Sequence, residues 1–388
     1  MTKRNIKKIA NNFIKEVRSL YSDENIPLHR PIFNGNECKY LVECINSNFV
    51  SSVGKKVTEF ENKVAEFTGS KYAIATMNGT AALHAAISLA GVKPNDEVIT
   101  QSLTFIATCN AISYAGAKPI FVDVDLDTMG LSPLSLRRFL ENNAEKRKDG
   151  TFNKTSGKRI SACVPMHTFG LPCRIHEIAE ICTNWDIALI EDAAESLGSY
   201  VGNQHTGVFG SMATLSFNGN KVITTGGGGM IITNNDELAK HAKHITTTAK
   251  VPHVYEFIHD EIGYNYRLPN LNAALGCAQM ERLDEFLDIK IKLAKQWSIF
   301  FSDMEIKFVE AIDGNKTNHW LNAIILDSKE DRNEFLQLTN NNNVMTRPIW
   351  TLMSKLQMYK NCQTDGLENS LWLEDRVVNI PSSIPNGA

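Results

Sequence analysis

A lysine beside a glycine-rich turn is the residue of this 388-residue chain best placed for covalent chemistry. Lys221 follows an apolar, strand-like run over residues 213–217 and precedes four glycines, Gly226 to Gly229. Small neighbours leave room for a planar group to lie against the chain. Twenty-nine positions earlier, another apolar run ends in carboxylates that include Asp192. This pair could serve pyridoxal 5′-phosphate (PLP), whose aldehyde bonds to a lysine and whose ring nitrogen keeps its proton beside an acid.

A third segment has the chemistry of a phosphate cup. Asn78, Gly79 and Thr80 follow the strand-like run 72–76 and open a helix rich in Ala and Leu. Free N–H groups at a helix start, a hydroxyl and the helix dipole all favour a phosphate. Each feature alone also fits an ordinary role: N-capping by Asn78 or Thr80, a helix cap at Asp192, or a loop lysine. Their conjunction is what indicates a cofactor site.

Four motifs occur in order along the chain. They are Asn78-Gly79-Thr80, Glu191-Asp192-Ala193-Ala194-Glu195, the segment Ser216 to Lys221, and Gly263-Tyr264-Asn265-Tyr266-Arg267. This order resembles the nucleotide-sugar aminotransferases of the DegT/StrS group, over about residues 27–383. Four further segments resemble the LegC-like branch, which serves legionaminic-acid and bacillosamine-type pathways. These segments are Phe49 to Lys55, Pro165 to Gly170, Thr246 to Lys250, and Met345 to Pro348.

The resemblance implies roles for particular cofactor-binding residues. Lys221 would bond to PLP, Asp192 would pair with the pyridine nitrogen, and Phe105 would stack on the ring. The phosphate contacts would come from Gly79, Thr80 and Ser216. Asn265 would reach the phosphate from the neighbouring subunit, so the resemblance implies a homodimer with shared active sites. By the resemblance Glu195 would lie near the cofactor's phenolic oxygen, where many relatives have Gln or His, and a carboxylate there would need a proton, a water or another orientation.

Other residues are candidates for the substrate pocket. They are His167, Lys250, Arg267, His319, Trp320 and Arg347. The guanidinium groups of Arg267 and Arg347 suit the donor carboxylate or a diphosphate, and a structural ion pair is the alternative. For His167 the alternative is a packed, hydrogen-bonded residue at a strand end. His319 and Trp320 fall where relatives bring residues of the C-terminal domain to the site, and Lys250 lies on a segment expected to cross to the partner.

The activity that the resemblance implies is a transfer of nitrogen. L-glutamate would give its amino group to C4 of a UDP- or GDP-linked 4-keto-6-deoxy-N-acetylhexosamine, and the 4-amino-4,6-dideoxy product would enter surface glycan or nonulosonic acid biosynthesis. A PLP-dependent sugar dehydratase is an alternative, but that branch has His in place of Lys221. A non-catalytic sensor on the same fold should have lost Lys221, Asp192 or the phosphate cup, and all three are present. A lyase or racemase acting on amino acids also remains open.

Strands and helices must alternate to position these residues. The short apolar runs predict an α/β fold with a mostly parallel sheet covered by helices on both faces, and the resemblance implies the aspartate aminotransferase type (fold type I). We expect an N-terminal helical extension over 1–26, a large PLP-binding domain over 27–270, and a long linking helix with a small α+β domain over 271–388. The finer expectations are a helix over 6–21, an extended segment over 27–54, an exposed loop over 141–159, a helix over 270–301, and strands near 318–326 and 343–346.

Composition narrows the function little. A net charge of -3 with scattered lysines gives no reason to expect nucleic-acid binding. No apolar run reaches the roughly 20 residues that a membrane helix needs, and no signal peptide is visible. The eight cysteines lack the paired spacing of a metal site, so we expect free thiols, no metal and a cytoplasmic location.

Overall fold

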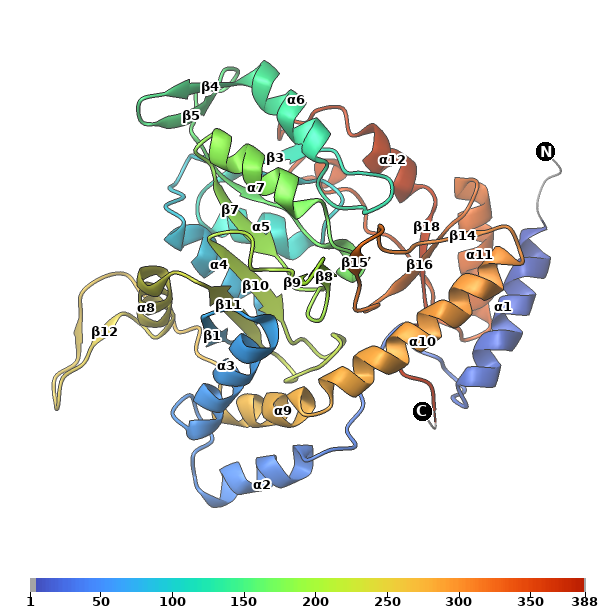
Figure 1. The fold of residues 1–388 in the computed structure, drawn as a ribbon, viewed down its shortest axis with the longest axis horizontal. Helices are drawn as coiled ribbons and strands as arrows, with labels where there is room; N and C mark the ends of the chain where they lie inside the picture. Colours follow the sequence, from blue (N-terminus) through green and yellow to red (C-terminus); the bar gives the residue numbers. More distant parts are fainter. Residues whose placement is uncertain (1–4, 387–388) are drawn as a thin grey trace.

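The computed structural model describes residues 5–386 and is built around a seven-stranded sheet (Figure 1). The strand order is β1-β11-β10-β7-β6-β2-β3. The bounds are β1 Tyr72–Thr76, β2 Glu97–Gln101, β3 Lys118–Val122, β6 Ile160–Val164, β7 Ala188–Asp192, β10 Met212–Ser216 and β11 Gly229–Thr233. β11 runs antiparallel to β1 and β10, and the other neighbouring strands of this sheet are parallel. The predicted mostly parallel sheet is confirmed.

Helices cover both faces of this sheet, as predicted. One face packs against α4 Gly79–Leu89, α5 Ile106–Tyr114 and α8 Asp236–Thr246. The other packs against α3 Lys55–Thr68, α6 Pro133–Asn143, α7 Ile175–Asn184 and α9 Asn270–Met280. Neighbouring residues of one strand point to opposite faces of the sheet. Val98 and Ile190 belong to the first core, whereas Ile99 and Leu189 belong to the second. This is the two-residue period of a strand that is buried on both sides.

The long helix α10 Leu283–Ser302 begins beside α9 and runs toward a second, smaller sheet (Figure 1). It has the order β14-β16-β18-β17, with β14 Lys307–Phe308, β16 Asn322–Ile325, β17 Arg347–Pro348 and β18 Val377–Ile380. The helices α11 Lys329–Asn341 and α1 Ile6–Leu20 pack beside it. Phe13 of α1 is fully buried against Trp297, Phe301 and Phe335. The first helix therefore belongs to the C-terminal core.

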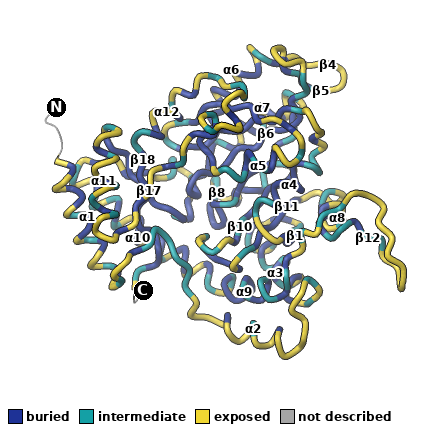
Figure 2. The backbone as a smooth tube through the Cα atoms, turned by 180° about the vertical axis from the view of Figure 1, so that it is seen from behind, coloured by how far each residue is buried: buried dark blue, intermediate teal, exposed yellow. Residues whose placement is uncertain are grey.

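The remaining elements are short. They are α2 Glu37–Asn46, α12 Glu368–Glu374, the hairpins β4 Ala144–Arg147 with β5 Gly150–Asn153 and β12 Lys250–Val251 with β13 Ile258–His259, the strands β8 Tyr200–Val201, β9 Gln204–His205 and β15 Asn315–Lys316, and the 3-10 turns Thr168–Gly170 and Met353–Lys355. The β12–β13 hairpin projects from the body of the molecule (Figures 1 and 2) and carries exposed residues along most of its length.

Several local expectations were wrong. Helix α2 lies within residues 27–54, which were expected to be extended. Its sequence shows no clear apolar face, because its buried side chains are only Glu37 and Cys44. The polar stretch 141–159 contains the β4–β5 hairpin, which turns at residues 148–149 and resumes at Gly150 with φ 132°. The helix expected over 270–301 is broken at Arg282, which turns the chain between α9 and α10. The strand expected at 343–346 forms at Arg347–Pro348 instead.

The division of the chain into three parts, with boundaries at residues 27 and 271, stays a prediction. Residues 1–4 of the first part and 387–388 of the last part lie outside the described chain. Among residues 5–386, no helix has both the length and the apolar character needed to cross a membrane. All eight cysteines are free thiols, and six of them are buried.

Candidate active site

One cavity of about 570 Å³ lies where the carboxyl ends of the central strands face the smaller sheet. Ligands of open α/β sheets bind at this edge. The cavity brings together the predicted residues Gly79, Thr80, Phe105, Asp192, Glu195, Ser216, Lys221, Trp320 and Arg347. Asp192 ends β7, Ser216 ends β10 and Gly79 begins α4 directly after β1. Residues far apart in the sequence thus line one space because their strands end at one edge.

The Lys221 side chain is held on two sides. Its Nζ lies 3.3 Å from Glu195 Oε1 and 3.8 Å from the centroid of the Trp320 ring. The Trp320 indole N–H donates to the carbonyl of Asn220 at 2.6 Å, which fixes the ring to the same turn. The Lys221 side chain is 13% exposed, so its amine faces the cavity from within the protein and not from a free loop.

Asp192 is a buried carboxylate with two hydrogen-bond donors. The Thr108 hydroxyl donates to Oδ2 at 2.7 Å and the Ala194 N–H to Oδ1 at 3.2 Å. Burial raises the pKa of Asp192 and outweighs the Thr108 hydrogen bond, which lowers it. Within residues 5–386, no lysine, arginine or histidine forms an ion pair with Asp192. A protonated pyridine nitrogen is the kind of cationic N–H group that would complete this environment.

The start of α4 fits a phosphate. Asn78 caps the helix by accepting from the Ala81 N–H at 2.8 Å, so the capping alternative holds for this residue. In the described chain, the hydroxyls of Thr80 and Ser216 have no hydrogen-bond partner, although both residues line the cavity. A Cβ on Gly79 would lie 3.0 Å from Ser216 Cβ, closer than most Cβ contacts, so glycine favours the close approach of these two segments. The cup therefore offers free donors at a helix N-terminus, as an anion requires.

Glu195 is buried beside Lys221. Its Oε2 accepts from the Phe169 N–H at 2.9 Å, while Oε1 faces the Lys221 amine. Burial raises the pKa of Glu195 to about 7, although the neighbouring Lys221 charge opposes the shift. Of the options that the sequence left open, this environment favours a carboxyl group that holds its proton near neutral pH.

Two aromatic side chains, Phe105 and Trp350, also line the cavity. Phe105 is 48% exposed and its ring centroid lies 6.2 Å from that of Trp350. Trp350 packs in turn on Phe169 at 5.1 Å. Trp350 was not predicted from the sequence, and its nearest signal is its place two residues after the Met345–Pro348 segment. The role of Thr108 was not predicted either, because no sequence pattern links a hydroxyl on α5 to Asp192.

Two predicted histidines do not line the cavity. His167 is fully buried, its Nε2 pairs with Glu191 at 3.0 Å and its Nδ1 accepts from the Cys173 N–H. The packed, hydrogen-bonded alternative describes this residue. His319 has a positive φ of 49°, and burial lowers its pKa to about 4. A neutral imidazole in that position is poorly suited to bind an anion.

Three further candidates lie on or beside the projecting hairpin. Lys250 Nζ stands 3.9 Å from the Phe257 ring centroid. Asn265 and Arg267 are exposed and hydrogen-bond to each other at 3.0 Å. Within one chain none of the three lines the cavity. Their role in a neighbouring subunit stays a prediction.

The arrangement of lysine, buried acid and phosphate cup defines a PLP-dependent transferase of the α/β type. The chain matches the model of the DegT/DnrJ/EryC1/StrS aminotransferase family over residues 31–385 and belongs to that family. The GDP-perosamine synthase of Escherichia coli O157:H7 is 35% identical over 359 residues, covering 92% of this chain and 93% of the relative. That of Vibrio cholerae is 33% identical over 360 residues, covering 92% and 94%.

A solved structure agrees with this assignment. The DegT DnrJ EryC1 StrS aminotransferase from Brucella abortus superposes with a TM-score of 0.81 at 26% identity, covering 89% of this chain and 90% of the other. The protein is therefore a PLP-dependent aminotransferase, as the sequence predicted.

Proposed function

We propose that the protein moves the amino group of L-glutamate to C4 of a nucleotide-linked 4-keto-6-deoxy-N-acetylhexosamine and so forms the 4-amino-4,6-dideoxy sugar. The observation that carries this is the single cavity in which Lys221, Asp192 and the free hydroxyls of Thr80 and Ser216 meet. Relatives named GDP-perosamine synthases support a nucleotide sugar as the acceptor. The LegC-like segments support the N-acetyl group and leave UDP as well as GDP open.

When bound, PLP supplies an electron sink for breaking bonds at the carbon next to the nitrogen. Lys221 would bond to its aldehyde, and Asp192 would keep the proton on its ring nitrogen. Gly79, Thr80 and Ser216 would hold its phosphate at the start of α4.

The Lys221 amine is the group placed to move protons. It removes the Cα proton of glutamate in the first half-reaction and returns a proton to C4 of the sugar in the second. Glu195 lies 3.3 Å from this amine and has a pKa raised to about 7 by burial, so it can exchange a proton with the amine near neutral pH. The presence of Lys221 disfavours the dehydratase alternative, in which a histidine takes its place.

Arg347 lies at the edge of the small sheet and lines the same cavity. Its guanidinium suits the diphosphate of the acceptor or the carboxylate of the donor. We further propose a homodimer in which Lys250, Asn265 and Arg267 reach the partner's cavity, because all three lie outside the cavity of their own chain.

Mass spectrometry of the products tests this function. Purified protein is incubated with glutamate and, separately, with UDP- and GDP-linked 4-keto-6-deoxy sugars with and without an N-acetyl group. We expect the 4-amino sugar and 2-oxoglutarate in equal amounts, with the N-acetylated acceptor preferred, and no product from Lys221→Ala. Continued release of 2-oxoglutarate over many turnovers without any sugar, or amination of none of the acceptors, contradicts the proposal. Borohydride reduction should fix the cofactor on the peptide that contains Lys221, and label on another lysine contradicts the site.

A further inference from the structure

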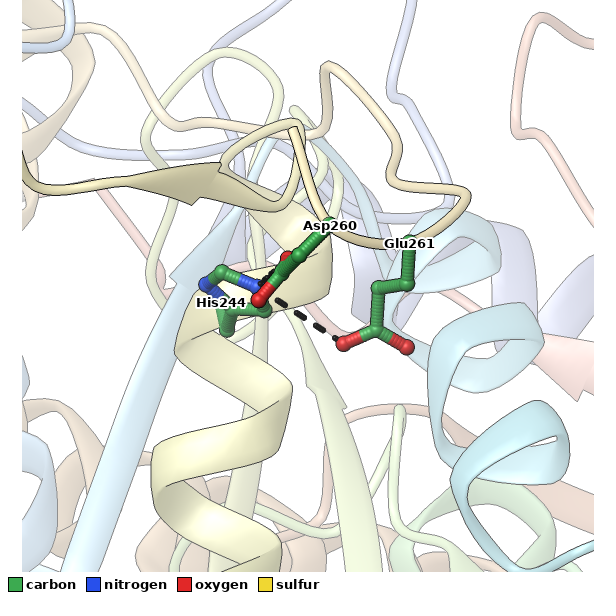
Figure 3. A group of neighbouring side chains, drawn as sticks. All are labelled: His244, Asp260 and Glu261. Atoms are coloured by element: carbon green, nitrogen blue, oxygen red, sulfur yellow. Dashed lines mark hydrogen bonds and ion pairs between the residues drawn. The ribbon is translucent and has the colours of Figure 1, made fainter. Parts of the chain in front are cut away.

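A cluster of metal-ligating side chains lies outside the active site, where the projecting hairpin rejoins the body. His241 and His244 stand one turn apart on α8, and Asp260 and Glu261 follow β13 on the returning strand. Residues three apart on a helix share a face. Figure 3 shows the side chains of His244, Asp260 and Glu261 turned toward one another.

The distances are close to those of a metal site. His244 Nε2 lies 2.6 Å from Asp260 Oδ1 and 3.7 Å from Glu261 Oε1. One donor atom from each of His244, Asp260 and Glu261 lies within 4.8 Å of the other two. Ligands about 2.0–2.2 Å from a tetrahedral zinc ion are separated by roughly 3.3 Å. Small side-chain rotations would therefore place all three donor atoms around one ion.

A fourth residue, His241, contacts Glu261, one of the three candidate ligands. The Nε2 of His241 lies 2.9 and 3.0 Å from the two oxygens of Glu261. Carboxylates that bind metals are commonly held by such an outer hydrogen bond, which orients them and is needed for full affinity.

The ligand set identifies the class of ion. One imidazole nitrogen and two carboxylate oxygens suit Zn²⁺ and neighbouring divalent transition metals better than Ca²⁺ or Mg²⁺, which take oxygen ligands. All three side chains are at least a quarter exposed, since His244 is 25%, Asp260 54% and Glu261 40% exposed. A water molecule can therefore occupy the fourth position.

The cluster lies where a link between the β12–β13 hairpin and α8 would stabilise the hairpin. The hairpin has only two paired residues on each strand. Its tip exposes apolar side chains, among them Val254 at 95% and Phe257 at 78%. Exposed ion pairs stabilise a fold little, so the pairs alone hold the hairpin weakly. We propose that a divalent transition-metal ion of the Zn²⁺ class binds His244, Asp260 and Glu261 and fastens the base of the β12–β13 hairpin to α8.

Binding of Zn²⁺ to the PLP-loaded protein tests the site, with the histidine tag removed and bound metal first stripped by a chelator. Calorimetry should give one ion per chain, and Co²⁺ should produce the visible absorption of a site with nitrogen and oxygen ligands. His244→Ala and Glu261→Gln should each weaken binding at least about tenfold, and His241→Ala by a comparable factor. His253→Ala is the matched control, because His253 lies on the same hairpin and its contacts are with Tyr255 and Glu256, outside the cluster.

Limited proteolysis gives a second measurement that does not depend on activity. Zn²⁺ should slow cleavage within residues 252–262 of the wild type and of His253→Ala, and should have no such effect in His244→Ala. The ligands are on the surface, so circular dichroism and the melting temperature should be unchanged in the metal-free variants. Equal Zn²⁺ affinity in His244→Ala and His253→Ala, or no binding below millimolar Zn²⁺, would falsify the proposal and leave these contacts as ion pairs only.

Discussion

The carboxyl group of Asp192 faces the cavity with a hydroxyl and an amide as its partners and no cationic side chain bound to it. Residue types and spacing were enough to predict Asp192, Lys221 and the phosphate cup, because these residues belong to contiguous motifs. Trp350 and Thr108 could not be predicted, since their positions relative to the cavity depend on how helices and the second sheet pack. For His167 the structure matches the alternative that the sequence left open, a packed strand-end histidine, because it is buried and pairs with Glu191.

Replacing Asp192 by asparagine tests its role. The amide has nearly the same shape and can still accept from Thr108, but it cannot stabilise a positive charge on the ring nitrogen. We expect Asp192→Asn to bind PLP and to slow both half-reactions by roughly 10²–10⁴, the range of an acid–base group. Single-turnover measurements with glutamate alone, and then with the keto sugar, separate the two halves. Near-normal rates would show that another group holds the ring.

Glu195 predicts a pH effect on stability. Burial raises its pKa from 4.5 to about 7, so between these values the folded chain holds a proton that the unfolded chain has released. Stability due to this group is therefore present below pH 4.5 and is lost as the pH rises through 7. Glu195→Gln removes this dependence, so the cofactor-free variant should gain stability relative to the wild type between pH 5 and 7.5. Urea-unfolding midpoints at both pH values measure the difference, and parallel curves would contradict the assignment.

Among the elements, the central strands were predicted well and the connections between them poorly. β1, β2 and β3 form where apolar runs indicated them, since buried strands carry an uninterrupted hydrophobic signal. Helix α2 was missed because most of its side chains are exposed, so it has no apolar stripe to recognise. The break at Arg282 was missed because the apolar pattern continues from α9 into α10.

Lys290 shows how α10 connects the parts of the molecule. Its buried amine donates to the carbonyls of Ser382 at 2.6 Å and Trp320 at 3.3 Å, and contacts His29 Nε2 at 3.0 Å. Burial lowers its pKa from 10.5 to about 7. Between these values the unfolded chain holds a proton that the folded chain lacks, so stability due to this group rises with pH. The wild type should therefore gain stability relative to Lys290→Met from pH 7 to pH 9, as thermal or urea unfolding would show, and a constant difference contradicts this.

For the whole molecule, the exposed position of Asn265 bears on assembly. Phe49 is 55% and Phe257 78% exposed in the single chain, which is the kind of apolar surface that a partner covers. Two-fold pairing is the commonest way for two copies to share sites reciprocally. We therefore expect a homodimer in which each cavity receives Asn265 from the other chain.

Subunit mixing tests this expectation. Lys221→Ala and Asn265→Ala, once each is shown to be inactive alone, are mixed under conditions that allow exchange. One cavity of the mixed dimer then carries both changes and the other carries neither, so activity should partly return. If exchange is demonstrated by a mass label and no activity returns, Asn265 acts in its own chain and the shared-site proposal fails.

The order in which the cavity's walls occur along the chain has a consequence for protein synthesis. All seven strands of the central sheet are complete by Thr233, and with them Lys221, Asp192 and the phosphate cup. Trp320, Arg347 and Asn379, which line the same cavity, are translated later. Ser382 and Ser383 then bind the segment at residues 28–30 and so join the two ends of the chain. A ribosome therefore makes one half of the cavity's wall first, and the cavity can close only after β18 has been translated.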